Sequence, residues 1–226
     1  GAGAGANDDL TNNRNVLLGF ESGVANTVGF NNVASGYRSL YSNTSGDRNV
    51  GIGYESLYNS TSSDANVGIG AGALYSNVAG SRATAVGTGA MYYVDNATGP
   101  ANIYNVAFGY EALRGTTTAA SNTGTQNSAI GYQSLFINST GSRNTALGHS
   151  VLFNNSIGND NIGIGYITMF DNLSGNENIA LGSNTLRFNQ SGDANIGIGV
   201  DALRTNISGD NNVAVGDNAL RVNTSS

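Results

Sequence analysis

Asn49-Val-Gly-Ile-Gly53 is the stretch that decides the fold, because the same five-residue phrase returns along the whole chain. It consists of asparagine, an apolar residue, a small residue, an apolar residue and glycine, and we call the last residue the anchor glycine. The anchor glycines are Gly19, Gly36, Gly53, Gly70, Gly87, Gly109, Gly131, Gly148, Gly165, Gly182, Gly199 and Gly216. Nine of the eleven steps between them are 17 residues and two are 22. A fixed period over this many units predicts a repeat architecture.

The composition agrees with one elongated unit and excludes several functions. No composition shift marks a linker, so we expect an extended N-terminal lead at 1–12 and a single repeat domain at 13–226. The net charge of −6 argues against a nucleic-acid partner, which needs a basic face. Without cysteine there is neither a disulfide nor a thiolate metal site. No apolar run approaches the ~20 residues that span a bilayer, so we expect no membrane insertion.

Each unit is too short for a strand, a helix and their turns, and it fits a coil of a parallel β-solenoid. Large and small residues alternate before the anchor glycine, as in Val50-Gly51-Ile52, which is the period of a strand. Leucine or methionine lies four residues after the anchor glycine, and we expect a second short strand to carry it. Polar turns such as 43–49 join the two. The sequence therefore predicts an all-β solenoid, or β-roll, of about twelve 17-residue coils.

Stacking of the coils would align equivalent residues into ladders along the rod. We expect the Val/Ile and Leu/Met ladders to fill the interior, with alanine and glycine on the opposite strand face. The asparagine four residues before the anchor glycine is expected to form an internal amide ladder, whose side chains satisfy one another and the turn backbone. Its clearest members are Asn15, Asn49, Asn66, Asn127, Asn144, Asn161, Asn178, Asn195 and Asn212.

The two 22-residue units each carry a five-residue insertion, within 92–104 and 114–126. In repeat proteins, insertions map to loops on one face, which is often the functional face. We give equal weight to the alternative that each insertion is a tolerated surface loop without a function.

Phrases such as Asn144-Thr-Ala-Leu-Gly148 and Asn178-Ile-Ala-Leu-Gly182 resemble the YadA-like head repeats of trimeric autotransporter adhesins. The longer unit, as in 127–141, is more similar to repeats of phage tail fibres and fibre-like bacterial surface proteins. The resemblance covers about 13–223. It implies a β-roll, three chains packed side by side, and a place outside the cell, on the cell surface or in a virion tail fibre.

The titratable residues do not form a recognisable catalytic set. The single histidine, His149, follows an anchor glycine at a position that is tyrosine in five other units, so we interpret it as one rung of a surface ladder. Asp47, Asp193 and Asp210 follow turn glycines, where Asx turns explain them without calcium. We expect no catalytic residue, no metal and no cofactor. A carboxylate pair of the glycosidase kind, formed across coils or chains, stays a remote alternative.

An aromatic or arginine residue lies five residues after every anchor glycine from Gly36 onward. Such a stripe is typical of a contact surface for a glycan or a protein, and packing between chains is the alternative that we favour. The series is Tyr41, Tyr58, Tyr75, Tyr92, Arg114, Phe136, Phe153, Phe170, Arg187, Arg204 and Arg221.

Nine Asn-X-Ser/Thr sequons occur, six of them seven residues after an anchor glycine. If the chain is glycosylated, the glycans would line one edge of the rod, whereas good turn chemistry alone also explains the pattern. The sequons are at Asn43, Asn59, Asn96, Asn138, Asn154, Asn172, Asn189, Asn206 and Asn223.

Taken together, these patterns predict a non-enzymatic extracellular fibre segment that associates with itself as a homotrimer and has a host or cell-surface glycan or protein as a further partner. The alternative is an end-to-end filament, since neither end of the chain carries the atypical polar repeat that caps natural solenoids. A polysaccharide-active fibre enzyme is the remote alternative.

Overall fold

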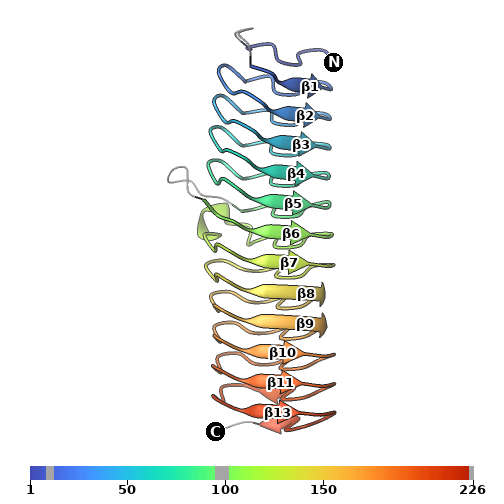
Figure 1. Cartoon of the computed structure of the whole chain (residues 1–226), viewed down its shortest axis with the longest axis vertical. Coiled ribbons are helices and arrows are strands. Elements are labelled where there is room, and N and C mark those ends of the chain that lie inside the picture. Colours follow the sequence, from blue (N-terminus) through green and yellow to red (C-terminus); the bar gives the residue numbers. More distant parts are fainter. Residues whose placement is uncertain (9–12, 95–101, 224–226) are drawn as a thin grey trace.

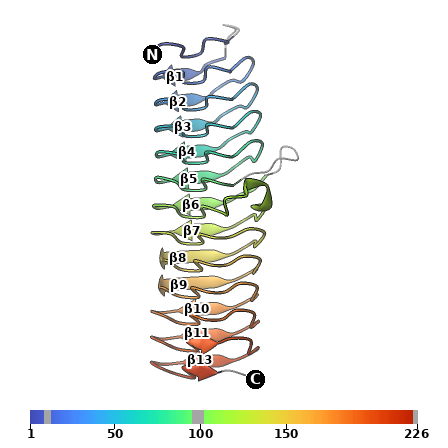
Figure 2. The same cartoon turned by 180° about the vertical axis from the view of Figure 1, so that it is seen from behind.

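The computed structural model describes residues 1–8, 13–94 and 102–223. These residues form a single rod of stacked coils, with the two ends of the chain at opposite ends of the rod (Figures 1 and 2). The fold is the predicted all-β parallel solenoid, and successive coils lie 17 residues apart except at the two insertions.

One parallel sheet of twelve strands runs the length of the rod, in the chain order β1 to β11 followed by β13. Each coil adds one strand in exact phase, so that Val50 pairs with Val67 and Ile52 with Ile69. The strands are β1 (Val16–Leu18), β2 (Val33–Ser35), β3 (Val50–Ile52), β4 (Val67–Ile69), β5 (Thr84–Val86), β6 (Val106–Phe108), β7 (Ser128–Ile130), β8 (Thr145–His149), β9 (Ile162–Tyr166), β10 (Ile179–Leu181), β11 (Ile196–Ile198) and β13 (Val213–Val215). Near the C-terminal end, β12 (Thr205–Asn206) pairs with β14 (Val222–Asn223).

The interior is filled by the leucine and methionine ladder, as predicted. Its members from Leu40 to Leu203 are at most 2% exposed. They pack against the inward residue of each strand, which is a buried alanine or glycine in every strand of the sheet except β1, where it is the half-buried Leu17. A Cβ on Gly51 would lie 3.4 Å from Cγ of Leu40 and 2.6 Å from Oγ of Ser39. The two walls are therefore so close that only a very small residue fits opposite the leucine.

The predicted place of the Val/Ile ladder is wrong. Side chains alternate across a strand, so the inward position of the small middle residue sends both of its large neighbours outward. Ile52, for example, is 39% exposed and Val106 is 40% exposed. In most coils the interior thus needs only one large side chain, with Val151 as a second one beside Leu152, and the bulky face of the sheet is its outer face.

The expected second strand is also absent among the described residues, apart from the short β12 and β14. The leucine lies instead in a turn with left-handed backbone: φ is 51° at Leu40 and 49° at Leu135. The residue two positions earlier, such as Arg38, has the same sign of φ. Hydrogen bonds to the next coil support this uncommon conformation, since Leu57 N–H donates to the Ala73 carbonyl at 2.9 Å.

The anchor glycine is required by its neighbour in the next coil. At Gly53 φ is 131°, and a Cβ there would lie 2.6 Å from the carbonyl oxygen of Gly70. The same close approach links Gly182 to Gly199 at 2.6 Å. Only glycine allows both the backbone conformation and the stacking distance, which is why the period of the sequence is marked by this residue.

The described part of the N-terminal lead, residues 1–8, is not extended as expected, and residues 9–12 lie outside the described residues. Residues 2–7 form turns that continue the stack. Glu21 N–H donates to the Ala2 carbonyl at 2.9 Å, just as Arg38 N–H donates to Phe20 one coil later. Alternating glycine suits these turns, because Gly3 and Gly5 have φ of 71° and 59°.

The second insertion forms a bulge on one side of the rod, beside β6 and β7 (Figure 1). It contains the 3-10 helix η1 (Ala119–Ser121) and is held by Asn122, whose Nδ2 donates to the carbonyls of Tyr93 and Thr116 at 2.8 and 2.9 Å. Much of the first insertion, 95–101, lies outside the described residues.

Candidate functional site

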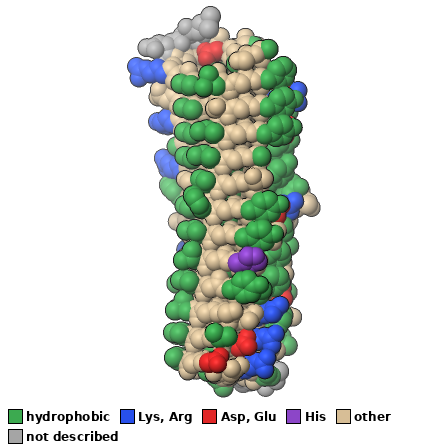
Figure 3. All heavy atoms as spheres, turned by 90° about the vertical axis from the view of Figure 1, so that its right-hand side faces the viewer, with side chains coloured by type: hydrophobic (Ala, Val, Ile, Leu, Met, Phe, Trp, Pro, Cys, Tyr) green, Lys and Arg blue, Asp and Glu red, His purple; other side chains and the backbone are tan. Residues whose placement is uncertain are grey.

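The outer face of the sheet carries two columns of mostly large apolar side chains, one on each side of the buried middle residue, with serine or threonine at 35, 84, 128 and 145. Thirteen apolar members are 36% to 67% exposed, and the others, such as Val50 and Leu181, are half-buried. Figure 3 shows lines of hydrophobic side chains that run along the rod. The exposed members are Val16, Leu18, Ile52, Ile69, Val106, Phe108, Ile130, Leu147, Ile162, Ile164, Ile198, Val213 and Val215. An apolar face of this length is far more than the scattered exposed residues of an ordinary surface.

The ladder predicted five residues after the anchor glycine exists as a stack of half-buried rings, which we call the inner ladder. Tyr41, Tyr58, Tyr75 and Tyr92 stack with centroids 4.7–5.1 Å apart. Phe136, Phe153 and Phe170 stack with centroids 4.7 and 4.8 Å apart.

Arginines continue the inner ladder where rings are absent, because a planar guanidinium packs on an aromatic face. Arg114 lies 5.1 Å from the Phe136 ring and Arg187 lies 6.0 Å from the Phe170 ring. Arg204 and Arg221 follow at the same position, where both are within 3.7 Å of Asp201.

A second, more exposed row of rings follows the anchor glycines directly, and we call it the outer ladder. Phe20, Tyr37 and Tyr54 stack at 5.5 and 5.1 Å, and Tyr110 stacks on Tyr132 at 5.4 Å. His149 is a rung of this ladder, 4.7 Å from the Tyr132 ring and 5.2 Å from the Tyr166 ring. The histidine therefore lies where the sequence predicted. That position gives it ring neighbours on both sides.

A cavity of about 360 Å³ lies where the outer ladder is interrupted. Two successive coils have Ala71 and Thr88 at the ring position, followed by Gly72 and Gly89. The missing side chains leave the cavity between Tyr54 at one end and Tyr110 at the other. Sequence analysis missed this site, although two successive small residues between Tyr54 and Tyr110 in the column of rings from Phe20 to Tyr166 were its signal.

The wall of the cavity carries phenols and charges. Tyr75, Tyr92 and Tyr93 line the cavity together with Glu55, Glu111 and Arg114. Burial raises the pKa of Tyr75 and of Tyr92, and the nearby carboxylate of Glu55 raises the pKa of Tyr54. These phenols therefore stay protonated at neutral pH and can donate hydrogen bonds. Arg114 pairs with Glu111 at 3.3 Å, whereas Glu55 has no ion pair among the described residues.

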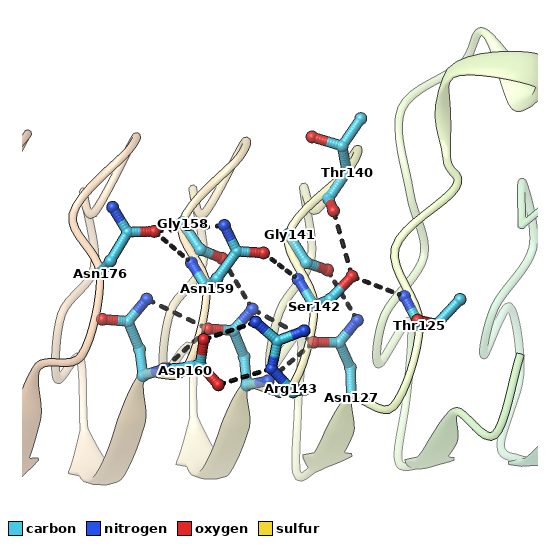
Figure 4. Close-up of polar contacts among 12 residues, drawn as sticks. Thr125, Asn127, Thr140, Gly141, Ser142, Arg143, Gly158, Asn159, Asp160 and Asn176 are labelled. Carbon is cyan, nitrogen blue, oxygen red and sulfur yellow. Dashed lines mark hydrogen bonds and ion pairs between the residues drawn. The ribbon is translucent and has the colours of Figure 1, made fainter.

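The internal amide ladder is as predicted. Asn161 donates from Nδ2 to the Gly175 carbonyl at 2.8 Å, and its Oδ1 accepts from the backbone N–H and the Nδ2 of Asn178 at 3.0 and 3.1 Å. The same geometry repeats at Asn127, whose Nδ2 donates to Gly141 at 2.8 Å (Figure 4). Each amide thus closes its own coil and bonds the next one, so its role is structural.

Another row of polar contacts, besides the internal amide ladder, lies nearer the surface, in the turns (Figure 4). Ser142 N–H donates to Asn159 Oδ1 and Asn159 N–H to Asn176 Oδ1, both at 2.9 Å. Beside them Arg143 pairs with Asp160 at 2.7 Å and lowers the pKa of that carboxyl. The pair is exposed, so its contribution to stability is small.

Most sequon asparagines form a second internal amide ladder that sequence analysis had not foreseen. Asn172 and Asn189 are fully buried; Nδ2 of Asn189 donates to Asn172 Oδ1 and to Gly192, both at 2.8 Å. Asn43, Asn138 and Asn206 are at most 4% exposed, and Asn223 is half-buried in the last coil. The nitrogen that would carry a glycan at these five buried positions is committed to the interior, so the folded rod has no room for one there. Asn59 and Asn154 are half-buried, and Asn96 lies outside the described residues.

The acidic turn residues serve the stacking of coils. Oδ1 of Asp47, Asp193 and Asp210 accepts a backbone N–H of the preceding coil, at 3.0, 2.7 and 2.7 Å. These bonds join coils, where the sequence predicted Asx turns within one coil. In the part of the chain that the structure describes, no group of three potential metal-ligating side chains occurs, and no helix is long and apolar enough to cross a membrane.

Comparison with known proteins gives no match to a protein-family model, to a curated protein or to a solved structure. The fold places the chain among the parallel β-solenoids, and its function is inferred below from its own surfaces.

The amide ladder makes a direct prediction for stability. Replacing Asn161 with alanine would leave the Gly175 carbonyl and the Asn178 N–H without their partners inside the rod. Each buried unsatisfied group costs about 1–3 kcal/mol, so we expect a loss of several kcal/mol in urea unfolding. Asn212→Ala is the matched control, because Asn212 is only part-buried and its side-chain bond runs to Asn195. Equal losses of unfolding free energy for the two variants would contradict the conclusion that the bonds of Asn161 to the next coil stabilise the rod.

Proposed function

We propose that this protein is a non-enzymatic structural rod of an extracellular fibre, in which three copies associate side by side through the outer face of the sheet. The observation that carries the proposal is the exposed pair of apolar columns along that face. They are exposed because alanine and glycine occupy the inward position, so the single chain has no place to bury them.

The size of the face is in the range of a stable interface. Strands about 4.8 Å apart, each with three residues of about 3.3 Å, give twelve coils a face of roughly 58 by 10 Å. A standard interface buries about 800 Å² of accessible surface per partner, and protruding side chains give this face more accessible area than its outline. Its charge-free composition matches the core of an interface better than its rim.

A trimer suits the shape of the rod. Each chain has one flat apolar side, and three such sides can enclose a common apolar core while the ladders and turns stay outside. Cyclic symmetry also closes the assembly, so that it does not grow sideways. The resemblance to repeats of trimeric adhesins and tail fibres favours the same number and an extracellular or virion location. Adhesion through the exposed turns and ladders is part of this proposal.

The alternative is an end-to-end filament. In it, the terminal strand of one copy would pair with the first strand of the next copy. Unpaired strand edges are templates for further pairing.

Sedimentation equilibrium tests the proposal. The parent is expected at three times the 23.0 kDa mass of the chain at micromolar concentration. A variant with Ile130→Thr, Leu147→Thr and Ile164→Thr should fold, since threonine suits strands, and should sediment as a monomer. The matched control is Ile157→Thr, Leu173→Thr and Ile207→Thr, which removes equally exposed residues outside the sheet and should remain trimeric. A monomeric parent would overturn the proposal, and open-ended polymers would favour the filament.

A further inference from the structure

We propose that the gap in the outer ladder is a binding site for the arginine side chain of a partner protein. This inference concerns the cavity between the two ladders and does not depend on the trimer, because the cavity is lined by ring and turn positions and not by the columns of the sheet.

The gap, which we call the slot, lies between two stacked parts of the outer ladder, one that ends at Tyr54 and one that begins at Tyr110. Within each continuous part of the outer ladder, the rings lie nearly parallel and about 5 Å apart: Tyr37 and Tyr54 are at 5.1 Å and 7°, and Tyr110 and Tyr132 at 5.4 Å and 10°. Ala71 and Thr88 remove two successive rungs. One face of Tyr54 and one face of Tyr110 are thereby left without the ring that would normally cover them, and planar groups fit between them.

The same two coils also have glycine two residues after the anchor glycine, where side chains of later coils lie close: a Cβ on Gly72 would be 2.7 Å from the Tyr92 ring, and one on Gly89 would be 3.2 Å from Cγ of Glu111. The position two residues after the anchor glycine carries Glu21, Arg38, Glu55 and Glu111 in neighbouring coils, but Gly72 and Gly89 here. Both the ring and the charged side chain are thus missing from the same place. The resulting cavity of about 360 Å³ is within the range of small-ligand sites.

The charges of the slot favour a cation. Glu111 is already paired with Arg114, whereas Glu55 has no ion pair among the described residues. The slot therefore has one uncompensated carboxylate beside an open aromatic face, and the protein as a whole carries a net charge of −6. A guanidinium satisfies both features, since it stacks on tyrosine and donates to a carboxylate in its own plane.

The protein itself contains a related arrangement two coils earlier, in which Glu21, Tyr37 and Tyr41 stand where the slot has Glu55, Ala71 and Tyr75. Arg38 donates from Nε to Glu21 at 2.7 Å, and its guanidinium carbon lies 5.0 Å from the Tyr37 ring and 5.3 Å from the Tyr41 ring. The groove between the two ladders thus accommodates a guanidinium that is stacked on tyrosines and paired with a glutamate. At Glu55 the partner is missing from the chain, and we assign that place to an arginine from another protein.

Isothermal titration with acetyl-Gly-Arg-Gly-amide tests this assignment on the full chain. The matched ligand is the same peptide with citrulline, which keeps the planar shape and loses the charge. We expect the arginine peptide to bind at least about tenfold more tightly than the citrulline peptide. Glu55→Gln should reduce its affinity by about tenfold without changing the melting temperature, because Glu55 has no ion pair to lose.

A variant that restores the missing rungs provides the structural test. Ala71→Tyr with Thr88→Tyr should complete the outer ladder and abolish binding, whereas Ser183→Tyr with Val200→Tyr adds rings at the same position in two other coils and should leave binding unchanged. If the filled variant fails to fold, the effect of Glu55→Gln on peptide affinity still tests the assignment.

Unchanged binding of the arginine peptide to the filled variant or to Glu55→Gln would overturn the assignment, as would the absence of detectable binding at millimolar peptide. Equal binding of citrulline peptide or methyl glucoside would indicate a neutral or sugar site instead, and tighter binding of agmatine than of the peptide would exclude a protein partner.

Discussion

Leu135→Asp is expected to prevent the rod from forming a continuous stack. Leu135 is fully buried and is the one large side chain that fills its coil. An aspartate there would be an unpaired charge in an apolar interior, with no room for water beside the alanine and glycine of the opposite wall. Leaving a charge uncompensated inside a protein costs about 3–5 kcal/mol, which is a large part of the 5–15 kcal/mol that stabilises a typical domain.

The matched control for this variant is Leu220→Asp. Leu220 occupies the same position and the same left-handed backbone in the last coil, but it is 51% exposed. We expect Leu220→Asp to melt close to the parent, and Leu135→Asp to lose hydrogen-exchange protection in the coils on both sides of the substitution. Identical melting of Leu135→Asp and the parent would show that the interior is assigned to the wrong residues.

The second large effect is expected for Gly182→Ala. The backbone of Gly182 has φ of 133°, and the added Cβ would lie 2.6 Å from the carbonyl oxygen and 2.8 Å from the carbonyl carbon of Gly199. Neither atom can move without separating two coils, and separation breaks the hydrogen bonds of the sheet on that side. We therefore expect a loss of stability well above the about 1–3 kcal/mol of a strained backbone alone. Urea unfolding measures it.

Gly216→Ala separates the two causes of that loss. Gly216 has a similar φ of 123°, but a Cβ there meets nothing within 4 Å. Its alanine variant should show only the cost of the backbone conformation. If Gly182→Ala and Gly216→Ala lose the same stability, the clash between coils is not what requires glycine at the anchor position.

These two pairs of variants address the same property, which is that the rod is only as thick as one leucine. The anchor glycines set the distance between coils, and the leucine and methionine ladder sets the distance between walls. Both distances are fixed by contacts that a methyl group or a charge would abolish. A repeat protein of this kind tolerates changes on its outer ladders and turns, where the candidate sites lie, far better than changes at these two positions.

Much of the candidate site was visible in the sequence, because stacking at a fixed period turns a sequence column into a spatial column. The inner ladder from Tyr41 to Arg221 and the rung at His149 follow from counting residues after each anchor glycine. The cavity could not be predicted by counting residues in this way. Its signal is the joint absence of a ring and of a charged side chain in the Gly70 and Gly87 coils, and an absence becomes a cavity only when the neighbouring columns are known to lie on either side of it.

The sequence by itself determined the solenoid, its period, its leucine interior and its internal asparagine ladder, because each of these depends only on which residues recur at the same position. It did not determine which face of the strand points inward. The alternation Val-Gly-Ile is the same for either choice, and the packing of Leu40 against the small middle residue, at a distance too short for any larger one, decided it. That single tertiary contact turned the valines and isoleucines from a predicted core into an exposed face. The sequon asparagines, which the turn sequence alone would place at the surface, are buried because their amides bond to one another and to turn carbonyls between coils.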